Sequence, residues 1–355
     1  MKTAEKRSGS SLIAYSAGHF LVDFACGYEL WAMYVRGDLE IISVSLIFLV
    51  YNLLAFATQF ALGAVSDKMK SNGALFAAAG CVLTAVGMLV GGAAPYVTVG
   101  LMGLGNSAFH VGGGTDALTR DRGMTRAGIF VSTGALGIAL GCHFGEEDII
   151  PAFMTIALLL TVAAAVCAYC TGERPASDEY TPSLTGKFSE KKFIPAALYG
   201  VIVLFVAVFI RSYVGFVATH PVSESKFAFL LPAAAAFAGK FLGGILADLI
   251  GARRTATAAL VLSAPLFFLG GSRFLFFLAA TFLFNIAMPV TLCEISRRLP
   301  SHEGVSFGLT ALALVAGYVL ALAVPLSDTV SPAASALLAV VAAVGIFLTT
   351  DDKRA

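Results

Sequence analysis

Long apolar stretches follow one another along almost the whole chain and decide what it can fold into. A helix that crosses the hydrocarbon core of a bilayer needs about 20 mostly apolar residues. Hydrophobic residues make up 58% of the 355 residues and charged residues only 13%, against about a quarter in a soluble domain. The sequence therefore predicts an all-α polytopic membrane protein with twelve transmembrane helices. The predicted spans are 11–34, 41–65, 73–93, 95–118, 126–146, 149–170, 193–217, 226–249, 254–270, 273–296, 304–325 and 331–350.

Lysine and arginine are unevenly distributed between the two sides that these spans define. Of 23 such residues, 18 fall on the side of the N-terminus, three on the other side, and Arg211 and Lys240 inside spans. The positive-inside rule therefore predicts that both termini are cytoplasmic, in a plasma or inner membrane. The first apolar run lacks a small-residue cleavage site, so we expect a retained span rather than a signal peptide.

The chain reads as two similar halves. Gly-Ala-Val-Ser-Asp-Lys at 63–68 ends the second span, and Gly-Ile-Leu-Ala-Asp-Leu-Ile-Gly-Ala-Arg-Arg at 244–254 ends the eighth. The longest polar segment lies between the halves and predicts a flexible cytoplasmic linker at 171–192. The predicted six-helix bundles, 1–170 and 193–355, share one orientation, because each has an even number of spans. They should be related by an axis along the membrane normal.

The second of these phrases, with its glycine, aspartate, glycine and arginine, resembles the signature turn of the major facilitator superfamily. The first phrase echoes it but departs after Lys68, where Ser-Asn-Gly at 71–73 does not supply the usual glycine and arginine spacing. Twelve spans in two parallel halves resemble that family along the whole chain. The resemblance implies a secondary transporter that works by alternating access, with spans one, four, seven and ten lining a central cavity.

The same resemblance implies a cytoplasmic gate. A carboxylate at a helix end can cap the positively polarised N-terminus of a neighbouring helix. The family architecture implies the start of the eleventh span, at 304–306, as the partner of Asp67, and Thr125 and Arg126 as the partners of Asp248. The alternative is that both acids only mark hydrated loops. The predicted gate residues are Gly63, Asp67, Lys68, Gly244, Asp248, Gly251 and Arg253.

A narrower likeness lies in the fourth span. Gly-Leu-Gly-Asn-Ser-Ala-Phe-His at 103–110 looks like the Gly-Leu-Gly-x-Ser-x-Phe-His stretch of fosmidomycin-resistance-type exporters, which typically continue with proline where this chain has Val111. The fifth span lacks the Gly-Pro pair associated with many antiporters of the superfamily. Because of the likeness in the fourth span, a drug or metabolite exporter that works as a proton antiporter stays the alternative function.

Ionisable residues inside a membrane are costly and mark transport pathways by default. Asp23 lies near the middle of the first span, and His19 is four residues earlier on the same helix face. His110 in the fourth span lies at a depth similar to that of His19. A carboxylate in a poorly hydrated cavity holds a proton more readily, and histidine titrates near neutrality. We predict that these three residues handle protons; the alternative is a structural pair of His19 and Asp23.

Two basic residues in the second half are the predicted contacts of the solute. Lys240 is buried in the eighth span, and Arg211 lies toward the outer end of the seventh. Both could bind a carboxylate or phosphate, although Arg211 could instead extend to the outer interface. Asn285 and Asn52, each near the middle of a span, are predicted hydrogen-bonding contacts, with helix–helix packing as the alternative.

Other functional classes find little support. Cys167-x-x-Cys170 has no second ligand pair nearby, and His143-x4-Asp148 has no nucleophile or cofactor loop. We therefore expect no enzyme activity, no cofactor and no metal, and a net charge of +1 gives no case for nucleic acid. A receptor or assembly factor that transports nothing is the second alternative. The sequence favours a monomeric carrier of a small polar or anionic organic solute, embedded in lipid and driven by protons.

Overall fold

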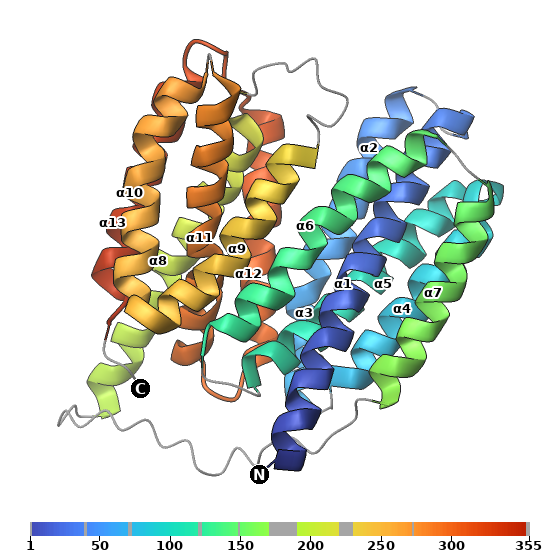
Figure 1. Ribbon diagram of the computed structural model, residues 1–355, viewed down its shortest axis with the longest axis horizontal. Coiled ribbons are helices and arrows are strands. Elements are labelled where there is room, and N and C mark those ends of the chain that lie inside the picture. Colours follow the sequence, from blue (N-terminus) through green and yellow to red (C-terminus); the bar gives the residue numbers. More distant parts are fainter. Residues whose placement is uncertain are drawn as a thin grey trace.

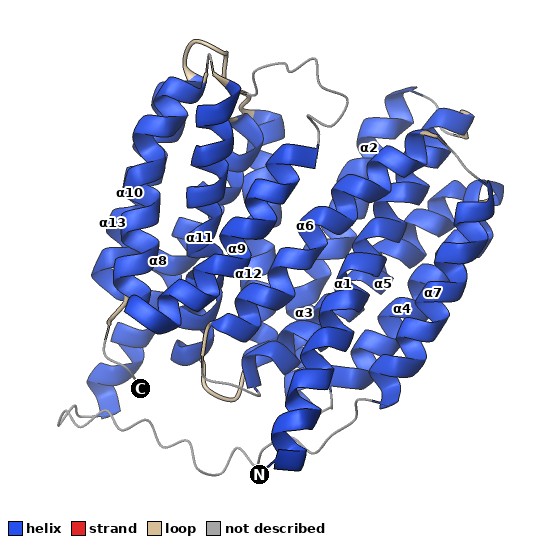
Figure 2. Ribbon diagram, in the orientation of Figure 1, coloured by secondary structure: helices blue, strands red, loops and turns tan. Residues whose placement is uncertain are grey.

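The computed structural model describes residues 2–38, 41–69, 73–119, 123–147, 150–169, 190–219, 230–271 and 273–352. Within these ranges helices are the only regular structure (Figure 2). They are α1 (Lys2–Arg36), α2 (Ile41–Asn52), the π-helical turn η1 (Leu53–Ala57), α3 (Thr58–Lys68), α4 (Gly73–Val90), the 3-10 turn η2 (Gly91–Ala93), α5 (Pro95–Thr119), α6 (Thr125–Glu146), α7 (Ile150–Tyr169), α8 (Glu190–Val217), α9 (Leu230–Ile250), α10 (Ala252–Gly270), α11 (Phe274–Arg298), α12 (Glu303–Ala323) and α13 (Ser331–Thr349).

Each predicted span corresponds to one helical segment, with two differences. The second span contains a π-helical turn, η1, between α2 and α3, and Leu46–Lys68 is still a single membrane-spanning length. The helix of the seventh span begins at Glu190, three residues before the predicted start, while residues 170–189 of the predicted linker lie outside the described residues. By length and composition, eight helices of the described chain are apolar enough to cross a membrane. The polar side chains of α5, which include Asn106, His110 and Asp116, lower its hydropathy.

The helices form two groups in space, α1 to α7 and α8 to α13 (Figure 1). In the first group α1 packs along α6, and α4 packs against α5 and α7. In the second group α10 packs against α11 and α13, and α8 against α12 and α13. The start of α1 and the end of α13 lie on the same side of the molecule (Figure 1), as an even number of crossings requires.

The two groups meet where glycines remove side chains from between their helices. Gly63 of α3 lies against the backbone of Gly304 in α12, and a Cβ on Gly304 would lie 3.0 Å from the Cα of Gly63. Gly128 of α6 lies against α9 in the same way, because a Cβ there would lie 3.0 Å from the Cα of Gly244. Small residues allow such close approach between helices. Both contacts lie toward the side of the termini, and the two groups diverge toward the opposite side (Figure 1).

Candidate functional site

The three predicted proton-handling residues lie together in the first half of the molecule. On α1, the four-residue spacing brings His19 Nε2 to 3.3 Å from a carboxylate oxygen of Asp23. From α5, His110 Nε2 lies 3.9 Å from the other oxygen of Asp23. The centroids of the two imidazole rings are 4.4 Å apart. We call His19, Asp23 and His110 the proton cluster.

Backbone carbonyls fix the orientation of both imidazole rings. His19 Nδ1 lies 2.7 Å from the carbonyl oxygen of Phe130, and His110 Nδ1 lies 2.9 Å from that of Asn106. A carbonyl oxygen only accepts hydrogen bonds, so each Nδ1 carries the proton and donates it. In a neutral ring Nε2 is then an acceptor that faces the carboxylate of Asp23, itself an acceptor. A proton on Nε2 of His19 or on the carboxylate would turn this contact between two acceptors into a hydrogen bond.

Asn106 completes the cluster, and the sequence had not placed it there. Its side-chain nitrogen donates to an Asp23 oxygen over 2.7 Å. Asn106 lies four residues before His110 on α5, the same spacing that joins His19 to Asp23, so helical periodicity was the signal that could have found it. Gly134 of α6 packs directly on the cluster, where a Cβ would lie 2.8 Å from Cε1 of His19. The absence of a side chain at Gly134 leaves room for the contact between His19 and Asp23.

Arg211 of α8 points into the protein and not to the outer interface. Only 6% of its surface is exposed. Its guanidinium donates to the carbonyl oxygen of Phe284 over 3.2 Å and to the hydroxyl of Thr291 over 3.5 Å, and it lies over the Phe284 ring. All of these acceptors are neutral. The Nε of Arg211 is buried without a hydrogen-bond acceptor.

Lys240 of α9 is half-buried, and its backbone packs against α6 of the first half of the molecule. Within the part of the chain that the structure describes, its ammonium makes no hydrogen bond or ion pair. The packing of Gly128 on the backbone of Lys240, where a Cβ would lie 2.8 Å from the carbonyl oxygen, sets this position.

Both acids of the repeated phrase, Asp67 and Asp248, cap helices of the opposite half. The Asp67 carboxylate accepts from the backbone N–H groups of Gly304 at 2.9 Å and Val305 at 2.8 Å, in the first turn of α12. The Asp248 carboxylate accepts from the N–H groups of Met124 and Thr125, each at 2.8 Å, and from the Thr125 hydroxyl at 2.6 Å. Each acid thus satisfies N–H groups that a helix start leaves free.

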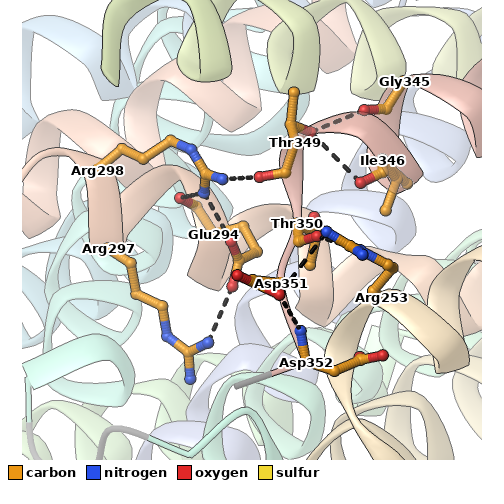
Figure 3. A network of polar contacts seen from close by, with 10 residues as sticks. All are labelled: Arg253, Glu294, Arg297, Arg298, Gly345, Ile346, Thr349, Thr350, Asp351 and Asp352. Carbon is orange, nitrogen blue, oxygen red and sulfur yellow. Dashed lines mark hydrogen bonds and ion pairs between the residues drawn. The ribbon is translucent and has the colours of Figure 1, made fainter. Parts of the chain in front are cut away.

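Of the other predicted gate residues, Gly63 and Gly244 lie between the halves, whereas Gly251 and Arg253 do not. Lys68 is exposed. Gly251 has a φ of 105°, in the left-handed region that favours glycine. Arg253 donates to the carbonyl oxygen of Thr350 over 2.5 Å and pairs with Asp351 at 3.7 Å, so it holds the end of α13 against α10 (Figure 3).

Comparison with known proteins rests on structure alone, because neither a family model nor any curated protein matches the sequence. The E. coli fucose:proton symporter FucP is 11% identical; the match covers 96% of this chain and 98% of that chain, with a TM-score of 0.68. A structure of the major facilitator superfamily transporter FucP in the outward conformation is 14% identical, with coverage of 95% and 100% and a TM-score of 0.64. The chain has the major facilitator fold. The fold class predicted from the sequence is confirmed, and the protein is a multi-pass membrane protein.

In this fold, one predicted gate partner acts elsewhere. The guanidinium of Arg126, expected beside Asp248, lies 3.2 Å from the buried carboxylate of Asp116 on α5. Ser11 of α1 donates to the same carboxylate over 3.2 Å. Asp248 instead uses backbone N–H groups and a hydroxyl, which cost less to bring together than two charges. The sequence had assigned no role to Asp116.

The two predicted asparagine contacts bond within their own helices. Asn52 donates to the carbonyl oxygen of Phe48 over 2.8 Å, and Asn285 donates to that of Thr281 over 2.9 Å. Asn285 also packs on Gly239 of α9, because a Cβ added at Gly239 would lie 3.0 Å from the Cβ of Asn285. The structure therefore does not bring these two residues to the proton cluster.

The proton cluster has the composition of a metal site as well. Its ligand atoms lie within 4.8 Å of one another, and no other group of three histidine, cysteine or acidic residues in the described ranges has such spacing. Two imidazoles and one carboxylate suit divalent ions such as zinc. The absence of a metal stays a prediction, which chelation tests directly.

Proposed function

We propose that the protein is a secondary active transporter that moves a small polar or anionic organic solute across the cell membrane by alternating access, coupled to protons. The observation that carries this proposal is the proton cluster, in which two imidazoles with fixed Nδ1 protons face one buried carboxylate. Such a group can take up and release a proton as its access to water changes from one side to the other.

Alternating access is supported by the position of the contacts between the halves. Asp67 and Asp248 both join the halves on the side of the termini, where the positive-inside rule puts the cytoplasm. This arrangement corresponds to a carrier closed toward the cytoplasm and open to the outside, the state that the compared FucP structure has in its outward conformation. We propose that release of the two helix caps opens the cytoplasmic side, and that a monomer carries out the cycle.

The test is transport by purified protein in liposomes. A mixture of neutral sugars, carboxylates and organic cations is presented outside, an inside-alkaline pH gradient is imposed, and the accumulated solutes are identified by mass spectrometry. We expect one solute class to accumulate only with the gradient, and Asp23→Asn to abolish the response to the gradient. Arg273→Gln, which removes an exposed cation, is the matched control.

Two outcomes would favour the alternatives. Accumulation driven by an inside-acid gradient, with the solute moving against the proton, would indicate an exporter that works as an antiporter. Failure of every solute to respond to either gradient, in protein that is shown to be folded, would contradict the transporter and favour a receptor or assembly factor.

A further inference from the structure

The proton cluster offers three metal-ligating atoms from two helices. His19 Nε2 lies 3.3 Å from one carboxylate oxygen of Asp23, one turn later on α1, and His110 Nε2 of α5 lies 3.9 Å from the other oxygen. One ligand atom of each residue lies within 4.8 Å of the others. Bonds of about 2.1 Å hold two ligand atoms about 3.4 Å apart around a tetrahedral zinc ion. The first contact already has this spacing, and the wider ones need to shorten by about 0.5 to 1.4 Å.

Both imidazole rings are held in the tautomer that binds a metal through Nε2. His19 Nδ1 donates to the carbonyl oxygen of Phe130 over 2.7 Å, and His110 Nδ1 donates to that of Asn106 over 2.9 Å. A metal-bound histidine almost always donates its other ring N–H to a carbonyl, a carboxylate or water, which fixes the ring and makes the ligand nitrogen more basic. The two backbone carbonyls therefore provide the outer contacts that such a site needs before any ion arrives.

The carboxylate of the cluster is also oriented, and an ion can reach it. Asn106 donates to one oxygen of Asp23 over 2.7 Å, and a hydrogen-bonded carboxylate is the usual state of such a ligand. The two histidines are buried, whereas 15% of the Asp23 side chain is exposed. Gly134 of α6 leaves room beside the ligand atoms, because a Cβ there would lie 2.8 Å from Cε1 of His19.

The partners of Asp23 differ from those of other buried acids in this protein. Asp116 pairs with Arg126 at 3.2 Å, and Glu294 pairs with Arg298 at 2.6 Å. Asp23 instead contacts two imidazoles and an amide. Imidazole nitrogen favours ions such as Zn²⁺, Ni²⁺ and Cu²⁺, whereas Mg²⁺ and Ca²⁺ take oxygen ligands. Two imidazoles to one carboxylate therefore select a transition-metal ion.

We infer that the proton cluster is an inhibitory site for a divalent transition-metal ion such as Zn²⁺, held by His19, Asp23 and His110. Structural zinc sites have four protein ligands, and this site has three, which leaves one position to water. We therefore expect reversible binding to a carrier that works without metal. A bound ion fills the lone pairs of both Nε2 atoms and of the carboxylate, so nothing else can bind to them and the carrier stops. The arrest, unlike the binding, rests on the proposed function.

The first test measures binding to the purified full-length protein at one fixed pH, without transport. The affinity tag is removed, and the protein is stripped with EDTA and dialysed. Zn²⁺ affinity is read from competition with a coloured chelator, with Mg²⁺ as the control ion. Co²⁺ is added in place of Zn²⁺, and its visible absorption reports the ligands. We expect Zn²⁺ to bind, Mg²⁺ not to bind, and Co²⁺ to give the spectrum of a nitrogen and oxygen site without the charge-transfer bands of a thiolate ligand.

Variants locate the ion. His110→Gln and Asp23→Asn each remove a ligand and should weaken Zn²⁺ binding by about 100-fold or more, since loss of an outer contact alone costs about 10- to 100-fold. Asn106→Ala removes only the hydrogen bond to the carboxylate and should weaken binding by about 10-fold. It keeps all three ligands and therefore reports on the site even if loss of a ligand prevents folding. His143→Gln, which removes a histidine that lies 3.9 Å from Glu146 at the end of α6, is the matched control and should bind as wild type.

The second test adds Zn²⁺ to liposomes that contain the wild-type protein. Gradient-driven accumulation should stop, EDTA added afterwards should restore it, and Mg²⁺ should have no effect. Accumulation that continues while the cluster holds Zn²⁺ would overturn the arrest.

Three results would overturn the site itself: no Zn²⁺ binds, Zn²⁺ binds equally well to wild type and to the variants of the cluster, or Co²⁺ shows a thiolate ligand. These results can be told apart from a failure of the proposed function. A protein that transports a solute but binds no Zn²⁺ is a carrier without the metal site. A protein that binds Zn²⁺ through the cluster but transports nothing keeps the metal site and contradicts the carrier.

Discussion

Lys240 on α9 and Asp23 on α1 belong to opposite halves of the molecule, yet both lie against α6: the backbone of Lys240 packs on Gly128 and the carboxylate of Asp23 packs on Gly134. An attraction between the ammonium of Lys240 and the carboxylate of Asp23 would act across the interface between the halves, which the helix caps of Asp67 and Asp248 also hold together. An anion bound to Lys240 and a proton bound to the cluster would each weaken it. In the proposed cycle, loading both sites thus removes one of the forces that oppose the movement of the halves.

Gly134→Ala should disable proton coupling without unfolding the protein. The added Cβ would lie 2.8 Å from Cε1 of His19 and closer still to Asp23, so the two side chains must move apart. A displacement on the order of 1 Å is enough to disrupt a site of fixed geometry, and we expect accumulation to fall by about tenfold or more. The measurement is gradient-driven accumulation in liposomes. Gly100→Ala, where an added Cβ meets nothing within 4 Å, is the control and should transport normally.

Asp67→Asn should shift the protein toward the state that is open at the side of the termini. The substitution removes the negative charge that caps α12, which we expect to cost about 1–2 kcal/mol. Spin labels at Phe144 on α6 and Leu231 on α9 report on the far side, where the halves diverge. We expect shorter distances between the labels to become more populated. The ratio of the state closed on the far side to the state open on that side should rise by about 5- to 30-fold. Asp328→Asn, an exposed acid between α12 and α13, should leave the distribution unchanged; an unchanged distribution in Asp67→Asn would contradict the gate.

Removal of metal ions should leave gradient-driven transport intact. In the proposed function the proton cluster holds a proton, although its three ligand atoms lie close enough to bind a divalent ion. Liposomes treated with EDTA and then with dipicolinate should accumulate the solute at the same rate as untreated ones. Loss of transport that zinc restores and magnesium does not would show that the cluster holds a metal instead.

Local periodicity explains why the sequence could predict much of this site. Apolar length located each span to within a few residues, because a membrane helix must hide its backbone along its whole length. The four-residue spacing put His19 and Asp23 on one helix face. The likeness to a known architecture then supplied the neighbourhood of the first and fourth spans, and His110 lies beside Asp23 as expected.

What the sequence could not supply is the choice of partner between helices. Arg126 was predicted as a partner of Asp248, yet it pairs with Asp116 on α5, and only the packing of α1, α5 and α6 decides between the two acids. The orientation of Arg211 toward α11 depends on packing in the same way. No propensity distinguishes the π-helical turn at Leu53–Ala57 from the helix around it, so the sequence predicted the span but not the turn within it.

Arg211→Met should stabilise the substrate-free protein while it abolishes anion binding. The guanidinium is buried and bonded only to neutral acceptors, so a side chain of similar length without charge removes an uncompensated ion from the interior. We expect the free energy of unfolding to rise by about 1–3 kcal/mol, measured as a higher midpoint of thermal unfolding in detergent. Arg298→Met is the matched comparison: it should lower the midpoint, because it removes a partner of the buried Glu294. If Arg211→Met instead lowers the midpoint as much as Arg298→Met does, then the neutral contacts of Arg211 serve the fold, and its charge is not reserved for a solute.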